Sequence, residues 1–278
     1  MNEKEIRLIA FDLDGTFLDE EKKIPEVNLR AIRAAAEQGI CIVPATGRLW
    51  EGLPQELRER EEIRYYILIN GAQIYDAKED RVLASAELSR EQAQALFAYG
   101  EELGCLYDCY MGNRAYMSRR FLEQLEDYVP EKNYVGYMKS IRTPVEDLRE
   151  TVREAGGSVQ KVQYFFRDME KRAEVMEHLG EIVPGVKATA SLRSNIEINS
   201  IEASKGKALE TLCSHLGFSK ENALAFGDGT NDLSMIEAAG IGAAMANADR
   251  KVLAAADRVA LSNNEGGVGQ LILELIEK

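Results

Sequence analysis

The sequence predicts an α/β protein in which both ends of the chain build one parallel-sheet core around an inserted α+β domain. Short apolar runs alternate with amphipathic stripes near both ends, an order typical of crossovers between parallel strands. The middle of the chain holds strand-like segments in hairpin order and most of the aromatic residues. We therefore expect a core formed by residues 1–82 and 200–278, interrupted by a domain at 83–199.

Short, nearly all-apolar segments are expected to form the core strands, because strands of a parallel sheet are covered on both faces. They lie at residues 6–11, 40–43, 66–69, 223–226 and 241–245. Pro44 follows the second of them, and we expect it beyond the end of the ladder, since a central strand does not tolerate proline. Apolar spacing predicts core helices at 26–38, 205–216, 233–239 and 266–276.

The inserted domain is expected to mix hairpin strands with helices. Residues 106–117 predict a hairpin that turns at Gly112-Asn113. Further strands are expected at 159–166, 186–191 and 195–199, and helices at 89–103, 119–128, 145–155 and 169–180.

Composition excludes several classes of partner. The 278 residues include 47 acidic and 34 basic side chains, a formal charge of −13, which would repel nucleic acid and acidic lipid. No apolar run approaches the roughly 18 residues that cross a bilayer, and the acidic N-terminus does not resemble a signal peptide. With four cysteines, none in a C-x-x-C pair, and two histidines, a zinc cluster is not expected. We expect a cytoplasmic protein with reduced cysteines.

The strongest candidate site directly follows the first strand, at Asp12-Leu13-Asp14-Gly15-Thr16. Ligands of parallel α/β sheets bind at the carboxyl ends of strands. Two neighbouring carboxylates repel each other unless a cation binds or one pKa rises, and Mg²⁺ suits oxygen ligands beside phosphates. The alternative is a solvated turn in which the two aspartates act as caps.

Two further motifs suggest an anion. Thr46-Gly47-Arg48 follows the second strand and offers a hydroxyl and backbone N–H groups, although Thr46 could instead cap a helix. Lys205 opens a predicted helix, where its charge has the wrong sign for the helix dipole unless an anion is also present. The alternative for Lys205 is an exposed surface lysine.

A second acidic loop, Gly227 to Asp232, follows the strand at 223–226. Asp228, Asn231 and Asp232 supply oxygens for a hard cation, although a glycine-rich turn capped by Asn231 or Asp232 would also fit. Two acidic loops at the ends of parallel strands, with a threonine and a lysine between them in sequence, together favour one chemical site.

These motifs, in this order, resemble the haloacid dehalogenase (HAD) superfamily, in its Cof-type sugar-phosphatase-like branch. The resemblance rests on DLDGT (12–16), ATGR (45–48), SKGKAL (204–209) and GDGTND (227–232), with NGA (70–72), ANA (246–248) and SNNEGGVG (262–269) in support. It implies a Rossmann-like parallel-sheet core with an inserted C2-type α+β cap. The segment before Lys205 departs from the family, because residues 199–203 lack its usual proline and glycine.

The resemblance also implies roles for individual residues. Asp12 would attack phosphorus and form an aspartyl-phosphate, while Asp14 would protonate the leaving alkoxide and then activate water. Mg²⁺ would be held by the Asp12 carboxylate, the Asp14 backbone carbonyl and Asp228, with Asp232 in support. The phosphoryl oxygens would be bound by Thr46, Gly47, Lys205 and Asn231.

The implied activity is Mg²⁺-dependent hydrolysis of a small phosphorylated metabolite, such as a sugar phosphate. Two alternatives stay open: a phosphotransferase or mutase of the same superfamily, and a slow phospho-accepting binding protein. The cap would close over the site and select the leaving group. Its aromatic residues are possible substrate contacts, although packing in the cap's own core is the favoured alternative for each one taken singly: Tyr107, Tyr110, Tyr116, Tyr164 and Phe166.

Overall fold

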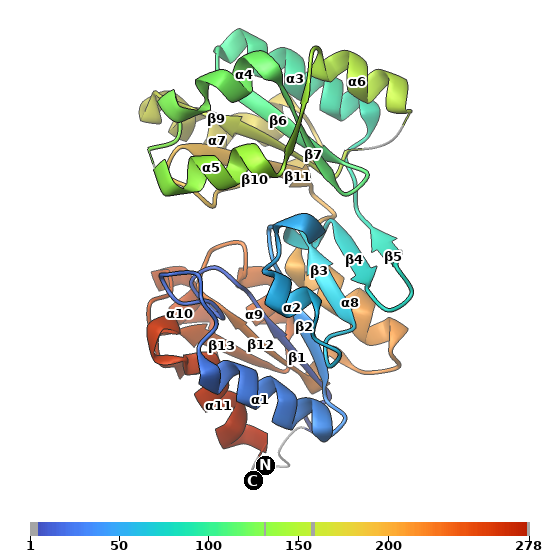
Figure 1. Cartoon of the computed structure of the whole chain (residues 1–278), viewed down its shortest axis with the longest axis vertical. Coiled ribbons are helices and arrows are strands. Elements are labelled where there is room, and N and C mark those ends of the chain that lie inside the picture. The colour runs from blue at the N-terminus through green and yellow to red at the C-terminus, as the bar shows by residue number, and fades with distance from the viewer. Residues whose placement is uncertain (1–4, 131, 157–158, 277–278) are drawn as a thin grey trace. The chain divides into compact units, whose positions relative to one another are not determined.

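The computed structural model describes residues 5–130, 132–156 and 159–276 (Figure 1). Contacts between residues divide the chain into two compact units. The core unit comprises Met1–Arg48, Leu53–Ser85 and Ser204–Lys278, and the inserted unit comprises Leu49–Gly52 and Ala86–Ala203. Among the described residues, no helix has both the length and the apolarity that crossing a bilayer requires.

The core unit is built on a five-stranded sheet in which every neighbouring pair is parallel, as predicted. The strand order is β14-β13-β12-β1-β2, which brings β12 and β2 to either side of the first strand. The bounds are β1 Leu8–Phe11, β2 Cys41–Pro44, β12 Ala223–Gly227, β13 Ile241–Met245 and β14 Arg258–Ala260.

Helices cover this sheet because its strands are apolar on both faces. Leu8 and Ala10 pack with Leu209 and Met235 of two helices, α8 and α9, while α1 and α11 contact each other (Figure 1). The helices of the core unit are α1 Glu26–Glu37, α2 Gln55–Arg58, α8 Lys205–His215, α9 Leu233–Ala238, α10 Arg250–Ala255 and α11 Gly267–Ile276. Single 3₁₀ turns lie at Ile69–Gly71, Lys220–Asn222 and Asn263–Glu265.

Pro44 lies inside the ladder, contrary to the prediction, and is paired with Phe11. The N–H groups of Cys41 and Ala45 donate to the carbonyls of Arg7, directly before β1, and of Phe11, in β1, so the alternating geometry turns the nitrogen of Pro44 away from that strand. Because β2 is the edge strand of the five-stranded sheet, among the described residues no further strand of that sheet lies on the side that this nitrogen faces, and the missing N–H of Pro44 interrupts no bond of the ladder.

An antiparallel sheet of three strands completes the core unit. Its strands are β3 Tyr65–Leu68, β4 Gln73–Asp76 and β5 Arg81–Ser85. Only β3 was predicted. The strands β4 and β5 mix polar and apolar residues, so they lack the uninterrupted apolar run that marked the parallel strands.

The inserted unit is built on a six-stranded sheet of order β10-β11-β9-β6-β7-β8, antiparallel except between β7 and β8. The predicted hairpin is present, with its turn at Gly112-Asn113. The strands are β6 Leu106–Met111, β7 Arg114–Ser118, β8 Arg142–Val145, β9 Lys161–Phe165, β10 Val186–Thr189 and β11 Asn195–Ser200. The helices are α3 Arg90–Leu103, α4 Arg119–Gln124, α5 Lys132–Ser140, α6 Leu148–Ala155 and α7 Met169–Ile182, with 3₁₀ turns at Trp50–Gly52 and Leu125–Asp127. Helix α5 and strand β8 were not predicted.

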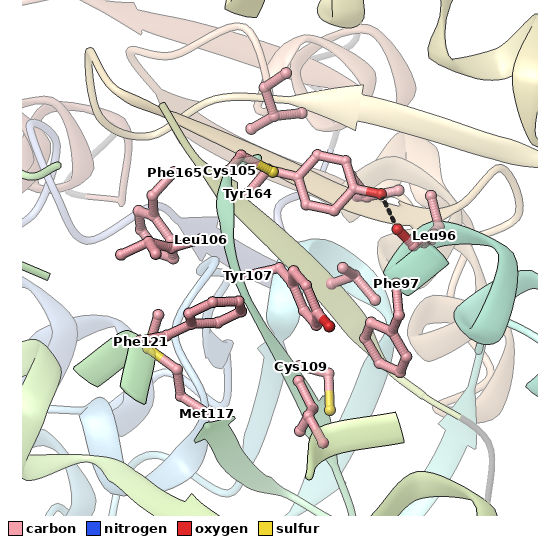
Figure 2. Packing of buried hydrophobic residues seen from close by; sticks show 14 of the residues in the cluster. Leu96, Phe97, Cys105, Leu106, Tyr107, Cys109, Met117, Phe121, Tyr164 and Phe165 are labelled. Atoms are coloured by element: carbon pink, nitrogen blue, oxygen red, sulfur yellow. Dashed lines mark hydrogen bonds between the residues drawn. The ribbon is translucent and has the colours of Figure 1, made fainter. Parts of the chain in front are cut away.

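Aromatic side chains pack among aliphatic ones in the hydrophobic core of the inserted unit (Figure 2). Tyr107 stacks on Phe97 at 5.4 Å between ring centroids and meets Phe121 edge-on at 4.9 Å. Tyr164 is fully buried, and its hydroxyl donates to the carbonyl of Leu96. The sequence left substrate contact and core packing open for five aromatics of this unit. Tyr107, Tyr164 and Phe166 belong to the core and Tyr116 packs against it, whereas Tyr110 is buried beside Nζ of Lys161, outside that cluster.

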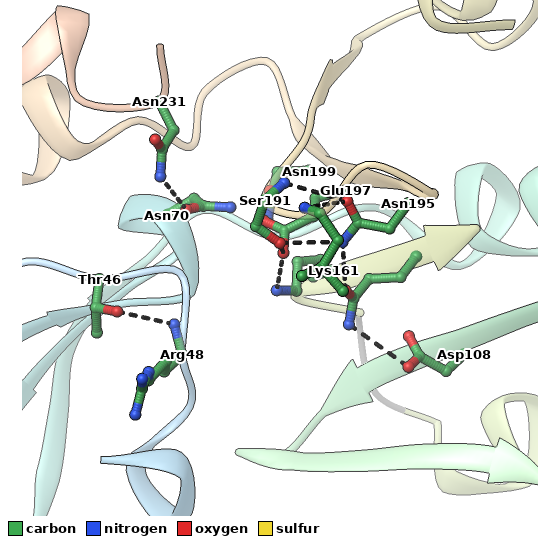
Figure 3. A network of polar contacts seen from close by, with 12 residues as sticks. Thr46, Arg48, Asn70, Asp108, Lys161, Ser191, Asn195, Glu197, Asn199 and Asn231 are labelled. Atoms are coloured by element: carbon green, nitrogen blue, oxygen red, sulfur yellow. Dashed lines mark hydrogen bonds and ion pairs between the residues drawn. The ribbon is translucent and has the colours of Figure 1, made fainter. Parts of the chain in front are cut away.

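A row of buried polar side chains crosses the same sheet, contributed by Asp108, Gln163 and Glu197 on three neighbouring strands (Figure 3). Arg142 donates from Nε to Oδ2 of Asp108 at 2.6 Å, and Lys161 lies 3.3 Å from Glu197. Pairing offsets the cost of burying these charges. Sequence periodicity did not anticipate this polar row.

Candidate active site

The candidate site lies where three adjacent strands end. In the sheet order β12-β1-β2, the first strand lies in the middle, so the loops that carry Asp12, Thr46 and Asp228 emerge at one edge. The backbone N–H of Asp12 still donates to the carbonyl of Phe226, at 3.0 Å. The two acidic loops, although far apart in sequence, are therefore neighbours in space.

Lys205 connects these loops. Its side chain is fully buried, and its Nζ lies 2.5 Å from Oδ1 of Asp12 and 2.6 Å from Oδ1 of Asp232. Helix α8 starts at this lysine. Ser204 caps the helix, and its hydroxyl accepts a hydrogen bond from the N–H of Lys207 at 3.0 Å. The surface alternative for Lys205 is thereby wrong: the lysine is an internal cation between two carboxylates.

The acidic residues outnumber this cation. Asp12, Asp228 and Asp232 each place one carboxylate oxygen within 4.8 Å of the other two. Burial raises the pKa of Asp12 well above its ordinary value and raises the pKa of Asp228 to about 6, and mutual repulsion adds to both shifts. Burial alone would lower the pKa of Lys205, but the charges of Asp12 and Asp232 outweigh it and raise that pKa. A cation bound here would relieve the repulsion.

The hydrogen bonds of Asp232 distinguish it from the other two aspartates. Its Oδ2 accepts from the N–H groups of Asp228 and Gly229, at 3.0 and 2.9 Å, while its Oδ1 faces Lys205. Asp228 uses Oδ1 to accept from the hydroxyl of Thr16 at 2.7 Å. The donor set fits a divalent cation held by Asp12 and Asp228, with Asp232 shaping the loop.

Gly15 allows the backbone after Asp14 to pass close to Asp228. Its φ is +85°, and a Cβ at this position would collide with the Asp228 carboxylate. We expect Gly15→Ala to weaken the binding of a divalent cation at least about tenfold, measured by calorimetry with Mg²⁺, because the methyl group must displace a carboxylate oxygen of the candidate cation site. The free energy of unfolding should fall by about 1–2 kcal/mol, because alanine is strained at this left-handed φ.

Gly39 provides a matched control, since its φ is +80° and, among the described residues other than its two chain neighbours, none has an atom within 4 Å of the position of a Cβ. Gly39→Ala should lower the free energy of unfolding by about 1 kcal/mol without any change in the binding of Mg²⁺. Equal effects of the two substitutions on Mg²⁺ binding would mean that Gly15 matters only for backbone conformation.

The side chain of Asp14 is not one of the three carboxylates of this cluster and has cationic partners of its own. Arg48 donates to it from Nε at 2.8 Å and from Nη2 at 2.6 Å, and Lys22 donates from Nζ at 2.8 Å. Burial alone would raise the pKa of Asp14, but the hydrogen bonds and charges of Arg48 and Lys22 lower it to about 2. Asp14 is therefore a carboxylate in this structure.

The threonine and asparagine of the predicted phosphate site lie in one chain of polar contacts. The N–H of Arg48 donates to the hydroxyl of Thr46 at 3.2 Å, and Asn231 donates to Oδ1 of Asn70 at 3.3 Å (Figure 3). A Cβ at Gly47 would lie 2.8 Å from that same Asn70 oxygen. The N–H of Asn70 also donates to the carbonyl of Thr46, at 3.0 Å, so Asn70 links the loop of Thr46 and Gly47 to the loop of Asn231.

Sequence reasoning did not assign site roles to Thr16, Lys22, Arg48 and Asn70. Thr16, Arg48 and Asn70 belong to the motifs DLDGT, ATGR and NGA, so those motifs carried a usable signal. Lys22 stands in a charged segment, Glu20 to Lys23, where nothing distinguishes it from the neighbouring lysine. Only the folded loop shows that it contacts Asp14.

Comparisons with known proteins identify the family of this chain. A family model described as haloacid dehalogenase-like hydrolase matches residues 9–272. The phosphatase YwpJ of Bacillus subtilis is 29% identical over 291 residues, covering 98% of this chain and 100% of that protein. The same organism's 5-amino-6-(5-phospho-D-ribitylamino)uracil phosphatase YcsE is 29% identical over 268 residues, covering 96% of this chain and 95% of that protein.

The fold has a match among solved structures as well. The structure of a haloacid dehalogenase-like hydrolase from Bacillus subtilis has a TM-score of 0.82 and is 29% identical, and the match covers 96% of this chain and 99% of that chain. The family suggested by the sequence motifs is thereby confirmed over nearly the whole length. The chain belongs to the haloacid dehalogenase-like hydrolases.

Proposed function

We propose that the protein is a Mg²⁺-dependent phosphatase that hydrolyses a small phosphorylated metabolite through an aspartyl-phosphate on Asp12. The observation that carries the proposal is the fully buried Lys205 beside Asp12, at 2.5 Å, within the cluster of Asp12, Asp228 and Asp232. A nucleophilic carboxylate, a fixed cation and a candidate metal site meet at one strand end. Phosphoryl transfer depends on this combination of positioning and charge stabilisation.

The named relatives support the reaction class. They match nearly the whole chain and are phosphatases, and this chain is likewise a hydrolase of phosphomonoesters. The name of YcsE specifies a phosphorylated ribitylamino compound, which supports a phosphorylated polyhydroxy metabolite, such as a sugar phosphate, as the substrate class here. The cytoplasmic location expected from the sequence stays a prediction.

In the proposed reaction, an oxygen of Asp12 attacks phosphorus while the bond to the leaving alkoxide breaks. Asp14, which is a carboxylate in this structure, first takes up a proton from solvent and gives it to that alkoxide. The Asp14 carboxylate then takes a proton from the water whose oxygen attacks phosphorus, and the bond between phosphorus and Asp12 breaks to release inorganic phosphate. Lys205 orients Asp12 and offsets the charge on the phosphoryl oxygens. We assign the remaining contacts with those oxygens to Thr46, Gly47 and Asn231.

The Asp12 carboxylate, the backbone carbonyl of Asp14 and Asp228 would hold the Mg²⁺ ion. Their oxygens are of the type that Mg²⁺ prefers, and the glycine at position 15 lets that backbone approach Asp228. When bound, Mg²⁺ would supply charge neutralisation for the carboxylates and the phosphoryl group. This explains how a protein with a formal charge of −13 can bind a phosphate ester.

We propose that the inserted unit selects the leaving group. The core residues account for the metal and the phosphoryl group, whereas the inserted unit has a hydrophobic core of its own and a row of polar side chains on its sheet. A test compares the substrate ranking of the whole chain with that of a core in which a linker replaces residues 86–203. An unchanged ranking in a folded core would contradict this role.

A screen of phosphorylated metabolites tests the proposed function. With Mg²⁺ we expect multiple turnovers that release inorganic phosphate, and removal of the metal with EDTA should lower the rate at least about 10²-fold, the scale of one lost electrostatic contribution. An isomerised sugar phosphate without free phosphate would indicate a mutase. A single stoichiometric phosphorylation without turnover would indicate a phospho-accepting binding protein.

A further inference from the structure

The carboxylate of Asp14 is held by two cations that come from different parts of the core unit. Arg48 follows β2 and donates two hydrogen bonds, one to each carboxylate oxygen, and Lys22 adds a third to Oδ1. The Arg48 side chain is 13% exposed, whereas that of Lys22 is 51% exposed. A bidentate arginine fixes both the position and the plane of a carboxylate.

Both cations stand on constrained backbone. The N–H of Arg48 donates to the Thr46 hydroxyl at 3.2 Å, and its carbonyl accepts from Ile69 at 3.0 Å. Lys22 lies in a tight turn that is closed by a bond from its own N–H to the carbonyl of Asp19, at 3.0 Å. The two donors are therefore positioned independently of Asp14.

The backbone of Lys22 is itself unusual. Its φ is +64°, in the left-handed region that favours glycine. A side chain kept there despite the cost points to a use for that side chain, and its ammonium group lies on Asp14. The neighbouring Lys23 pairs instead with Glu21, at 2.6 Å.

We propose that Lys22 and Arg48 are positioning residues that together orient the Asp14 carboxylate for its part in the reaction. The proposal rests on the proposed function, since it gives these two residues a role through the proton-transfer group of that reaction. According to this proposal, Lys22 affects kcat although it belongs to none of the sequence motifs. A carboxylate that must meet both a leaving oxygen and a water molecule requires a defined orientation, because small displacements cost rate.

The first test compares the kinetics of two variants with matched controls. Arg48→Met should lower kcat about 10–100-fold and Lys22→Gly about 3–10-fold, with KM within about threefold, since proton-transfer groups contribute on the order of 10²–10⁴. In the Asp14→Asn background, neither change should lower kcat further. The controls are Lys23→Met and Arg33→Met, an exposed arginine of α1, and both should keep the wild-type kcat.

A direct contact of Arg48 with the substrate would instead raise KM, and the loss would persist in the Asp14→Asn background. Either result overturns the proposal for Arg48. Lys22→Gly offers a further distinction, because glycine relieves the left-handed backbone. We expect this variant to unfold less readily than the wild type while turning over more slowly, whereas a merely structural lysine would lose stability.

The second test does not need an active enzyme. The second measurement is a double-mutant cycle, in which Arg48→Met, Asp14→Asn and the double variant are unfolded in urea. The change in the equilibrium constant of unfolding of the double variant should differ at least about threefold from the product of the changes in the two single variants. Additive effects would overturn the proposal that Arg48 holds the Asp14 carboxylate. If the wild type hydrolysed no phosphomonoester, the proposed function would fail, while this cycle would still decide whether Arg48 and Asp14 are coupled.

Discussion

Asp12→Asn should abolish turnover, lowering kcat at least about 10⁴-fold, on the scale measured when a catalytic nucleophile is removed. The amide lacks the nucleophilic oxygen and is also a poor ligand for Mg²⁺. The fold should persist, because Asp12 belongs to a group of mutually repelling carboxylates and its replacement relieves part of that repulsion. Phosphate release and urea unfolding measure the two effects separately.

Asp127→Asn is the control for this substitution. Asp127 pairs with Arg167 on the surface of the inserted unit, and exposed pairs contribute only about 0–1 kcal/mol. The control should keep both rate and stability. Wild-type turnover by the Asp12→Asn protein would exclude the aspartyl-phosphate mechanism. If Asp12→Asn did not fold, Asp12→Glu would replace it in the test: this variant keeps the charge but displaces the carboxylate oxygens, and it should lose turnover as well.

Lys205→Ala should lower kcat about 10²–10³-fold, the cost of removing one preorganised electrostatic group. It should also destabilise the fold by roughly 3–5 kcal/mol, because two buried carboxylates lose their cation. The relevant contacts are those with Asp12 and Asp232, at 2.5 and 2.6 Å. Initial rates at saturating substrate and unfolding curves check both effects.

Lys207→Ala is the matched control, two residues further along the same helix and exposed to solvent. Its stability should change by no more than about 0.5 kcal/mol, and its rate should be that of the wild type. If Lys205→Ala were destabilised but kept kcat within threefold after correction for folded protein, Lys205 would be structural and not part of the reaction.

The arrangement of the core could be predicted because its strands are short apolar runs with polar residues directly after them. Asp12 and Asp228 are far apart in sequence, yet parallel strands end at a common edge, so the two acidic loops were expected together. The edge position of Pro44 was not predictable in the same way. Strand order depends on contacts between distant segments, which no local pattern encodes.

The inserted unit was less predictable for a related reason. The strands were recognised from aromatic and apolar residues, but the row of Asp108, Gln163 and Glu197 gives β6, β9 and β11 a buried polar side. Local composition does not show which polar residues are buried, because burial depends on cross-strand partners. Whether Tyr107 packs in a core or faces a ligand was undetermined for the same reason.

The sequence by itself determined the fold class, the family and the identity of the residues at the strand ends, since these follow from short-range patterns and spaced motifs. Only the tertiary structure decided how the side chains pair. It shows Lys205 between Asp12 and Asp232, and it shows that the Asp14 carboxylate is held by Arg48 and Lys22. The physical reason is that charge pairing acts over a few ångströms in space, whereas these partners are separated by up to about two hundred residues along the chain.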